Sequence, residues 1–190
     1  MRVIAGVHRG RRLRGPRGHA IRPTSDRVKE ALFSILGDRT VGAHVLDLYA
    51  GTGSIGIEAL SRGAAHVTFV EADREALRLV QSNLHQCGLQ QHATICACQV
   101  VQFFRRGTQW SGPYDIVFCD PPYHLASELI ELIQEWDRRW LADDAVVILE
   151  HGRNATIPPT MGSLSQVKRY DYGDTALTRF QLTSEEARSS

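Results

Sequence analysis

The sequence predicts a single α/β domain built on a mostly parallel β-sheet with helices on both faces. Three observations predict it. Apolar and amphipathic helical segments alternate from residue 44 onward, a glycine-rich turn follows the first apolar segment, and acidic residues stand where several of these segments end. Strands that alternate with helices are typical of a parallel sheet. The 190 residues, 43% of them hydrophobic, are enough to bury one such core.

The first 40 residues precede this alternation. Two short segments, RVIA and RRLR, flank a glycine-containing turn at residues 6–10 and predict a β-hairpin. Residues 15–23 contain two prolines and two glycines and predict a loop. A helix with apolar residues at helical spacing follows, capped by Thr24 or Ser25 and closed by Gly37.

The alternating region predicts five strands and the helices between them. The expected strands are HVLDL, HVTFVE, ATICA, YDIVFCD and AVVILE, and the expected helices cover residues 55–61, 73–87, 100–105 and 124–140. After two prolines at 158–159 the periodicity changes. Residues 166–172 and 175–182 then predict a hairpin around Gly173 and Asp174.

Charge is distributed unevenly along the chain. The first 30 residues hold nine basic side chains against two acidic ones, although the formal net charge of the whole chain is only +1. A basic arm on a mildly acidic body suggests a polyanionic partner that docks at one end. The plainer alternative is a solvated basic hairpin that has no partner.

Cysteine usage and hydropathy exclude several classes of protein. Cys87, Cys96, Cys98 and Cys119 lack the paired spacing of a zinc site, so we expect buried, reduced thiols and no metal. No apolar run is long enough to span a bilayer, and the N-terminus lacks the apolar core of a signal peptide. We therefore expect a cytoplasmic protein that is not associated with membranes. We also expect a monomer.

The glycine-rich turn admits two ligand classes. Gly51, Gly53 and Gly56 match the pattern G-x-G-x-x-G, and Glu71 stands 20 residues after Gly51 at the end of the next expected strand. This spacing is that of a dinucleotide site, in which the acid accepts hydrogen bonds from ribose hydroxyls. It therefore leaves a nicotinamide-dependent oxidoreductase open.

Asp47 favours a different cofactor. It lies four residues before Gly51, near the carboxyl end of the first expected strand. A pyrophosphate gains nothing from an anion at this position, whereas the cationic amino-acid end of S-adenosylmethionine is attracted to it. The alternative interpretation of Asp47 is a carboxylate that only caps the following helix.

The fourth expected strand ends in Asp120, Pro121, Pro122 and Tyr123. Consecutive prolines fix φ and leave rigid carbonyl acceptors. An exocyclic amine on a base is a weak nucleophile, and acceptors for its protons orient the lone pair for attack. The Asp120 carboxylate and the Pro121 carbonyl can accept those protons, and Tyr123 offers a face for an extruded base. Here the alternative is a strand that merely ends in a proline turn.

Together these residues resemble the class I methyltransferases, and more closely the bacterial RsmD family of 16S ribosomal RNA guanine-N2 methyltransferases. The segments that carry the resemblance are RPTSDRVKEALFSIL, VLDLYAGTGSIGIEALSRGA and FCDPPY, and it extends from RVIAG to YGDTALTRF. The glycine turn or DPPY alone matches many methyltransferases, including those that act on adenine.

The resemblance implies a Rossmann-like fold with a seven-stranded, mostly parallel sheet, an antiparallel last strand and a small N-terminal β-hairpin. It divides the chain into the hairpin at residues 1–23, a methyltransferase domain at 24–183 and a flexible tail at 184–190. It also implies S-adenosyl-L-methionine as the cofactor. The implied cofactor contacts are Asp47, Tyr49, Gly51, Gly53, Glu71, Ala72, Gln99 and Val100.

The chain departs from the family pattern after the third expected strand. The family usually has an Asp-Ala pair there, whose acid meets the adenine amine, whereas this chain has Gln99 and Val100. The glutamine carbonyl can still accept a hydrogen bond from that amine.

The basic hairpin resembles the RNA-recognition arm of the family, for which arginine is suited because its forked donors match phosphate. The implied RNA contacts are Arg2, Arg9, Arg11, Arg12, Arg14, Arg17, Arg22 and Thr24.

The resemblance implies a catalytic set of Asp120 to Tyr123 that acts on guanine N2 of 16S ribosomal RNA, within the small subunit or an assembly intermediate. Two alternatives keep the nucleic-acid partner. One is an adenine-N6 methyltransferase on DNA or RNA, and the other is a non-catalytic RNA-binding module for ribosome assembly.

Overall fold

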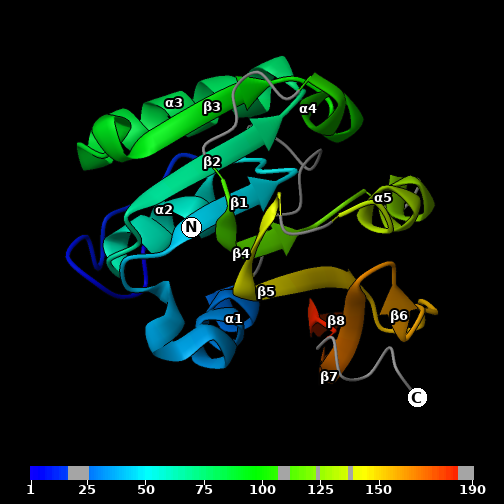
Figure 1. The fold of residues 1–190 in the computed structure, drawn as a ribbon. Coiled ribbons are helices and arrows are strands. Elements are labelled where there is room, and N and C mark those ends of the chain that lie inside the picture. Colours follow the sequence, from blue (N-terminus) through cyan, green and yellow to red (C-terminus); the bar gives the residue numbers. More distant parts are fainter. Residues whose placement is uncertain (17–25, 107–111, 123–124, 137–138, 184–190) are drawn as a thin grey trace.

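The computed structural model describes residues 1–16, 26–106, 112–122, 125–136 and 139–183 (Figure 1). Within them one eight-stranded sheet has the order β3-β2-β1-β4-β5-β8-β7-β6. The strands are β1 His44–Leu48, β2 His66–Glu71, β3 Ala93–Ala97, β4 Tyr114–Cys119, β5 Leu141–Gly152, β6 Thr160–Met161, β7 Leu164–Tyr172 and β8 Thr175–Leu182.

The strand directions confirm the expected fold class. The neighbours among β3, β2, β1, β4 and β5 are all parallel, whereas β8 is antiparallel to both β5 and β7. The last strand is thus reversed, as expected. The two-residue strand β6 pairs with β7 at the edge and raises the strand count from the expected seven to eight.

Helices cover both faces of the sheet, as Figure 1 shows. Consecutive strand residues point to opposite faces, so Val45 of β1 joins one hydrophobic core and Leu46 the other. The first core includes residues of α1, α2 and α3, and the second includes residues of α4 and α5. The helices are α1 Asp26–Leu36, α2 Ser54–Ser61, α3 Arg74–Cys87, α4 Val100–Arg106 and α5 Ala126–Ile133, with the short 3-10 helices η1 Gly37–Thr40 and η2 Gln90–His92.

The helix expected over residues 124–140 is much shorter in the structure. Helix α5 ends at Ile133, and hydrogen-bonded turns over residues 134–136 follow it. Trp136 and Trp140 continue a helical spacing in the sequence, but both rings pack on Phe104 of α4, with centroids 4.9 Å and 4.5 Å away. Burial against a neighbouring helix thus produced the apolar pattern, and the prediction of a continuous helix was wrong.

Several expectations fall on residues outside the described ones. They are the capping residues Thr24 and Ser25, most of the 15–23 loop, and the tail at 184–190. The expected C-terminal hairpin is confirmed: β7 and β8 pair around Gly173, whose φ is +64°.

The N-terminal segment forms the expected antiparallel hairpin, but its regular pairing is a single bridge between Arg2 and Arg12. Val3 N–H donates to the Arg11 carbonyl at 2.9 Å and the Gly10 N–H donates to the Val3 carbonyl at 2.9 Å. Val3 and Leu13 are buried in the first core. The hairpin is therefore packed on the domain and is not a free arm.

Two further findings concern the described residues as a whole. None of their helices is both long and apolar enough to cross a membrane. All four cysteines are free thiols, of which Cys87, Cys96 and Cys119 are buried and Cys98 is partly exposed.

Candidate active site

Three carboxylates predicted as site residues lie at or near the carboxyl ends of neighbouring parallel strands. Asp47 is in β1, Glu71 is the last residue of β2, and Asp120 directly follows β4. Strand β1 lies between β2 and β4, so Asp47 has Phe69 and Phe118 as its neighbours in register. Asp120 and Glu71 are both close enough for their negative charges to add to the effect of burial, which raises the pKa of the Asp47 carboxyl. The structure thus brings the three acids together at the carboxyl ends of neighbouring strands, where ligands bind in open α/β sheets.

The turn after β1 has the backbone that the glycine pattern predicts. Gly51 and Gly53 have φ of +55° and +75°, and Tyr49 also has a positive φ of 60°. Positive φ is costly for a residue with a side chain and is often found at functional sites. A Cβ at Gly51 would meet only the Tyr49 carbonyl, 3.9 Å away, so the turn is open at that point.

Gly56 has a packing role instead. A Cβ there would lie 2.3 Å from the Phe69 ring, and this contact requires glycine for α2 to pack closely on β2. The third glycine of a dinucleotide-type fingerprint has the same role.

Glu71 ties the turn to the end of β2. Its Oε2 accepts from Gly51 N–H at 2.8 Å, and its Oε1 accepts from the N–H groups of Ala72 and Asp73 at 2.7 Å and 2.8 Å. An ionised carboxylate has about four acceptor positions, so these three bonds leave room for one more donor. Glu71 can therefore accept a hydroxyl while it holds the turn.

Asp47 is 2% exposed, and its Oδ2 accepts from Gly56 N–H at 2.9 Å. The capping contact weighed as an alternative therefore exists, but it uses only one carboxylate oxygen. Burial, followed by the charges of Asp120 and Glu71, raises the pKa of Asp47 to about 8, against the lowering effect of the Gly56 bond. A buried acid whose pKa is raised in this way is a candidate functional residue, and a cation bound beside it would favour its ionised form.

The expected catalytic segment is described as far as Pro122, and Tyr123 lies outside the described residues. Burial raises the pKa of the Asp120 carboxyl to about 6. Pro121 is buried, and the Pro122 carbonyl accepts from Leu125 N–H at 2.8 Å just before α5. Because Pro122 uses its carbonyl to start the helix, the acceptors next to each other at this strand end are Asp120 and the Pro121 carbonyl.

The remaining predicted cofactor residues lie just after the carboxyl ends of β1, β2 and β3. Tyr49 packs against the second core, where burial raises the pKa of its hydroxyl. Ala72 is exposed directly after Glu71. Gln99 is exposed just beyond β3, its carbonyl accepts from Phe103 N–H at 3.0 Å at the start of α4, and Val100 is buried. These placements leave the Gln99 side chain accessible to a ligand.

The charged and hydrogen-bonding groups of the site fit S-adenosyl-L-methionine better than a dinucleotide. The amide of Gly56, in the first turn of α2, is already occupied by the Asp47 carboxylate. A pyrophosphate at this helix end would disfavour ionisation of Asp47 still further, whereas an ammonium group would favour the ionised carboxylate and be attracted to it. Glu71 supplies the acceptor for a ribose hydroxyl that both cofactors need. Among the described residues no group of three or more His, Cys, Asp or Glu could hold a metal ion.

The predicted RNA-binding arginines that the structure describes are all exposed on the hairpin, namely Arg2, Arg9, Arg11, Arg12 and Arg14. Arg2 Nε lies 3.5 Å from Asp26 Oδ2, and Arg11 Nη1 donates to the Gln86 carbonyl. Arg17, Arg22 and Thr24 lie outside the described residues.

The sequence patterns missed the residues that attach the hairpin to the domain. Glu58 of α2 is fully buried, and its carboxylate accepts from Ile4 and Ala5 N–H at 2.8 Å and 2.9 Å. It also meets Lys29 Nζ at 3.5 Å and Arg62 Nε at 2.9 Å. A charged residue inside the apolar α2 segment was the only signal in the sequence, and it does not reveal its partners.

Asn83 of α3 is the second missed residue. Its side chain is fully buried, accepts from Arg14 N–H at 2.7 Å and donates to the Arg14 carbonyl at 3.1 Å. It also donates to the Thr52 carbonyl in the glycine turn at 2.9 Å. Asn83 therefore connects the basic hairpin to the turn that borders the carboxylate site.

Comparison with known proteins identifies close relatives. The family model described as Conserved hypothetical protein 95 matches residues 1–181. Ribosomal RNA small subunit methyltransferase D of Escherichia coli is 35% identical over 183 residues, which cover 95% of this chain and 89% of that protein. The Haemophilus influenzae protein of the same name is 39% identical over 154 residues, which cover 79% of this chain and 78% of that protein.

A solved structure agrees with these sequence matches. The Escherichia coli protein yhhF superimposes with a TM-score of 0.83 at 33% sequence identity. The match covers 97% of this chain and 99% of that one.

Proposed function

Since this chain belongs to the family described as Conserved hypothetical protein 95, the RsmD family expected from its sequence, we propose that it methylates the N2 amine of a guanine in 16S ribosomal RNA. The chain is an S-adenosyl-L-methionine-dependent ribosomal RNA methyltransferase. The guanine N2 position and the small subunit, or an assembly intermediate of it, are the specific parts of the proposal.

The observation that carries the proposal is the convergence of Asp47, Glu71 and Asp120 at one sheet edge, with Asp120 directly before two prolines. Two of these acids serve a cationic, ribose-containing cofactor, and the third serves a neutral amine. A non-catalytic RNA-binding module has no need for two neighbouring acids, Asp47 and Asp120, whose pKa values are raised by burial. Shifts of this kind in the pKa of neighbouring acids are typical of catalytic sites.

The cofactor, when bound, supplies an electrophilic methyl group and leaves as a neutral thioether. Asp47 would hold the cationic amino-acid end, because a buried carboxylate gains most from a nearby positive charge. Glu71 would hold a ribose hydroxyl with its remaining acceptor capacity. Tyr49, Gly51 and Gly53 would line the open turn, and Ala72, Gln99 and Val100 the adenine side.

Asp120 and the Pro121 carbonyl would accept hydrogen bonds from the two protons of the target amine. Those bonds favour a pyramidal nitrogen and direct its lone pair toward the methyl group. Neither proline has an N–H, so this segment presents acceptors and no competing backbone donors there. Tyr123 would provide the stacking face for the flipped base.

The pKa of Asp120 also suits it to take the proton that the methylated amine must lose. At about 6, it leaves the carboxylate mostly ionised at neutral pH and yet basic enough to accept a proton. The strongly acidic alkylated amine transfers this proton readily to Asp120 or to water.

Identification of the methylated nucleoside tests the proposal. The enzyme is incubated with labelled S-adenosyl-L-methionine and, in parallel, naked 16S RNA, immature small subunits and DNA, and each product is digested to nucleosides. We expect N2-methylguanosine from one or both ribosomal substrates. N6-methyladenosine would replace guanine by adenine as the target. Tight RNA binding with no methyl transfer to any substrate would leave only the non-catalytic module.

A further inference from the structure

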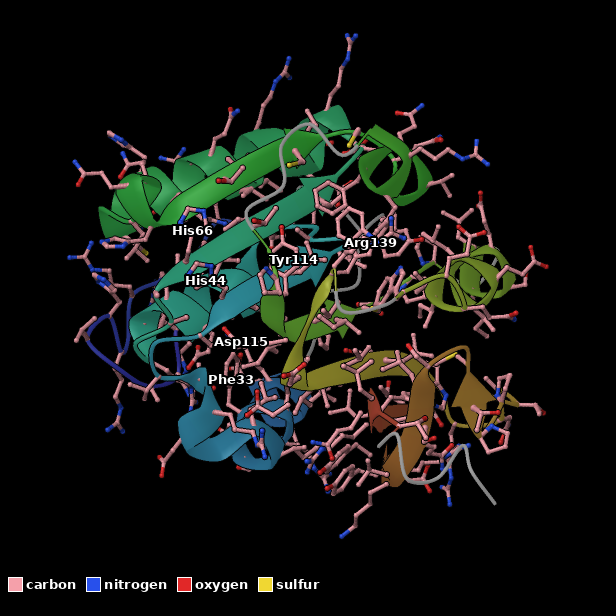
Figure 2. The ribbon with its side chains drawn as sticks, in the orientation of Figure 1. Phe33, His44, His66, Tyr114, Asp115 and Arg139 are labelled. Carbon is pink, nitrogen blue, oxygen red and sulfur yellow. The ribbon has the colours of Figure 1, made fainter. Side chains whose placement is uncertain are left out.

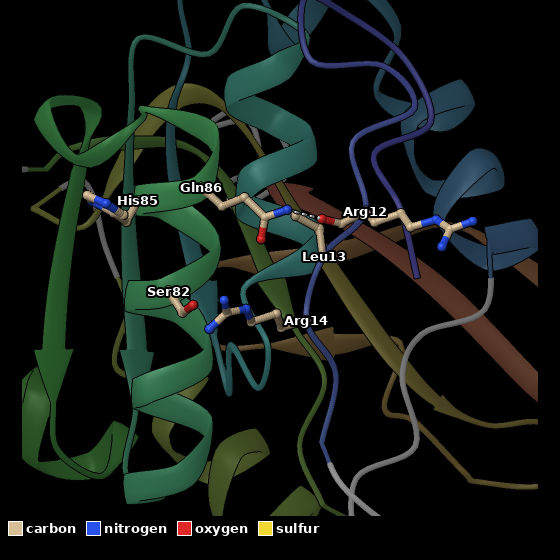
Figure 3. Close-up of a pocket in the computed structure, with 6 residues that line it drawn as sticks. All are labelled: Arg12, Leu13, Arg14, Ser82, His85 and Gln86. Carbon is tan, nitrogen blue, oxygen red and sulfur yellow. Dashed lines mark hydrogen bonds between the residues drawn. The ribbon is translucent and has the colours of Figure 1, made fainter.

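An open cleft separates the second strand of the hairpin from α3, on the side of the hairpin away from its tip. Its volume is about 540 Å³, and it is lined by Arg12, Leu13, Arg14, Ser82, His85 and Gln86 (Figure 3). In Figure 3 the Arg14 side chain extends across the cleft toward Ser82 of α3, whereas that of Arg12 points away from α3. The cleft is distinct from the carboxylate site.

Hydrogen bonds hold both walls of the cleft in place. Gln86 Nε2 donates to the Arg12 carbonyl at 2.9 Å, and Asn83 Oδ1 accepts from Arg14 N–H at 2.7 Å. Arg11 Nη1 donates to the Gln86 carbonyl from the hairpin side. The cleft is therefore formed before any partner arrives, and binding needs little further ordering.

The lining is suited to an anion with an extended backbone. None of the six lining residues is acidic, and the described hairpin residues 1–16 contain no acid at all. Ser82 supplies a hydroxyl. His85 borders the cleft on α3, and its Nδ1 lies 2.7 Å from the Gln90 amide nitrogen. Buried Leu13 adds an apolar floor.

The position of the cleft relates it to the active site. Helix α3 starts just after Glu71 and runs back along the sheet, so at 1.5 Å per residue Ser82 and His85 lie roughly 12–17 Å along the helix from its first residue, Arg74. Asn83 links the cleft wall at Arg14 to the glycine turn at Thr52. The cleft therefore lies within the length of a few nucleotides from the glycine turn and Glu71 of the proposed active site.

We propose that this cleft binds the phosphodiester backbone of the substrate RNA, a few nucleotides from the methylated base. Arg14 and Ser82 are the direct contacts. This inference rests on the proposed function for the identity of the strand. It assigns the RNA contact to a surface shared between the hairpin and α3, and not to the hairpin alone.

Fluorescence anisotropy with a fluorescein-labelled, mixed-sequence single-stranded RNA tests the cleft without methyl transfer. Arg14→Gln removes one charge and leaves the backbone bonds to Asn83 intact. Ser82→Glu adds an anion without touching the hairpin. The matched controls are Arg153→Gln, an exposed arginine outside the cleft, and Gln81→Glu, an exposed neighbour on α3 that does not line it.

We expect Arg14→Gln and Ser82→Glu each to weaken RNA binding by roughly tenfold. In Arg14→Gln, the slope of the logarithm of the binding constant against the logarithm of the salt concentration should become shallower by about 0.7. Both controls should bind as the unsubstituted protein does. Thermal unfolding of each variant verifies that it is folded. If the cleft variants bind RNA like their controls, the inference is overturned.

Two further probes separate phosphate from other ligands. A peptide nucleic acid of the same sequence has no phosphates, so its binding should be the same in Arg14→Gln as in the unsubstituted protein. Equal sensitivity would mean that the cleft reads bases, and displacement of RNA by polyglutamate of equal charge would identify an acidic protein as the occupant. Either result overturns the proposal. If RNA binding depends on the cleft but no methyl group is transferred, the proposed function is refuted and the RNA-binding role of the cleft stands. If methyl transfer occurs but RNA binding does not depend on the cleft, the role of the cleft is refuted and the proposed function stands.

Discussion

The side-chain amide of Asn83 donates a hydrogen bond of 2.9 Å to the carbonyl oxygen of Thr52, inside the glycine-rich turn. The same buried side chain is bonded to both backbone groups of Arg14 on the hairpin. One residue of α3 therefore joins the basic hairpin to the turn of the proposed cofactor site. Figure 2 shows the side chains on the ribbon; His44 and His66 lie next to each other at the starts of β1 and β2, at the opposite ends of these strands from the carboxylate site.

Asn83→Ala should weaken both the fold and cofactor binding. It leaves the buried Thr52 carbonyl and the Arg14 backbone without their partner, and each such loss costs about 1–3 kcal/mol. We expect the free energy of unfolding in urea to fall by about 2–3 kcal/mol and the affinity for S-adenosyl-L-homocysteine, measured by calorimetry, to fall with it. Ser82→Ala, one residue away, is the control and should change neither. Unchanged affinity in folded Asn83→Ala would show that the turn does not depend on this bond.

Glu58→Gln should release the hairpin from the domain. The substitution leaves fully buried Lys29 without its counter-charge, although burial already lowers the pKa of that lysine and Glu58 opposes the shift. Removal of one partner of a buried ion pair costs about 3–5 kcal/mol.

Hydrogen exchange of the Ile4 and Ala5 amides, which donate to Glu58, measures the release directly. We expect both amides to lose protection in Glu58→Gln. Arg62→Gln removes the more exposed partner of Glu58 and should leave these amides protected. Retained protection in Glu58→Gln would mean that the apolar contacts of Val3 and Leu13 suffice to hold the hairpin.

Asp47→Asn should separate stability from cofactor binding. The pKa of Asp47 is raised from its ordinary value to about 8 in the folded protein. The folded state therefore binds the extra proton, and its stability falls as pH rises from the unfolded-state pKa through about 8. An asparagine has no such penalty and can still accept the Gly56 bond.

The measurement is urea unfolding of both proteins between acidic and mildly alkaline pH. We expect the stability of Asp47→Asn relative to the unsubstituted protein to rise with pH, by up to about 1.4 kcal/mol per pH unit, while it loses affinity for S-adenosyl-L-homocysteine. Parallel pH curves would contradict a buried, protonated Asp47.

Much of this fold follows from local patterns in the sequence. β1, β2 and β3 have the predicted bounds, and β4 ends one residue early at Cys119, because parallel strands are short apolar runs bounded by turns. Asp47, Glu71 and Asp120 could be grouped in advance, since the carboxyl ends of parallel strands share one edge. The glycine pattern likewise anticipated the positive φ at Gly51 and Gly53.

Long-range partners could not be predicted in this way. Glu58 and Lys29 are 29 residues apart in sequence, and only the packing of α1 on α2 brings them together. Asn83 has the same character, because an amide on an amphipathic helix gives no sign of the backbone groups that it meets. The tryptophans after α5 misled the prediction since their spacing is helical while their burial depends on Phe104.

Asp120 is proposed to act on the target amine, whereas Asp47 and Glu71 hold the cofactor. A comparison of Asp120→Ala with the unsubstituted enzyme tests this assignment most directly. Single-turnover transfer of labelled methyl to 16S RNA should fall by about 10²–10³-fold. Calorimetry with S-adenosyl-L-homocysteine should show binding that is unchanged or tighter, because the negative charge of Asp120 opposes ionisation of Asp47. If transfer and cofactor binding are lost together, Asp120 supports the fold of the site and does not act on the target amine.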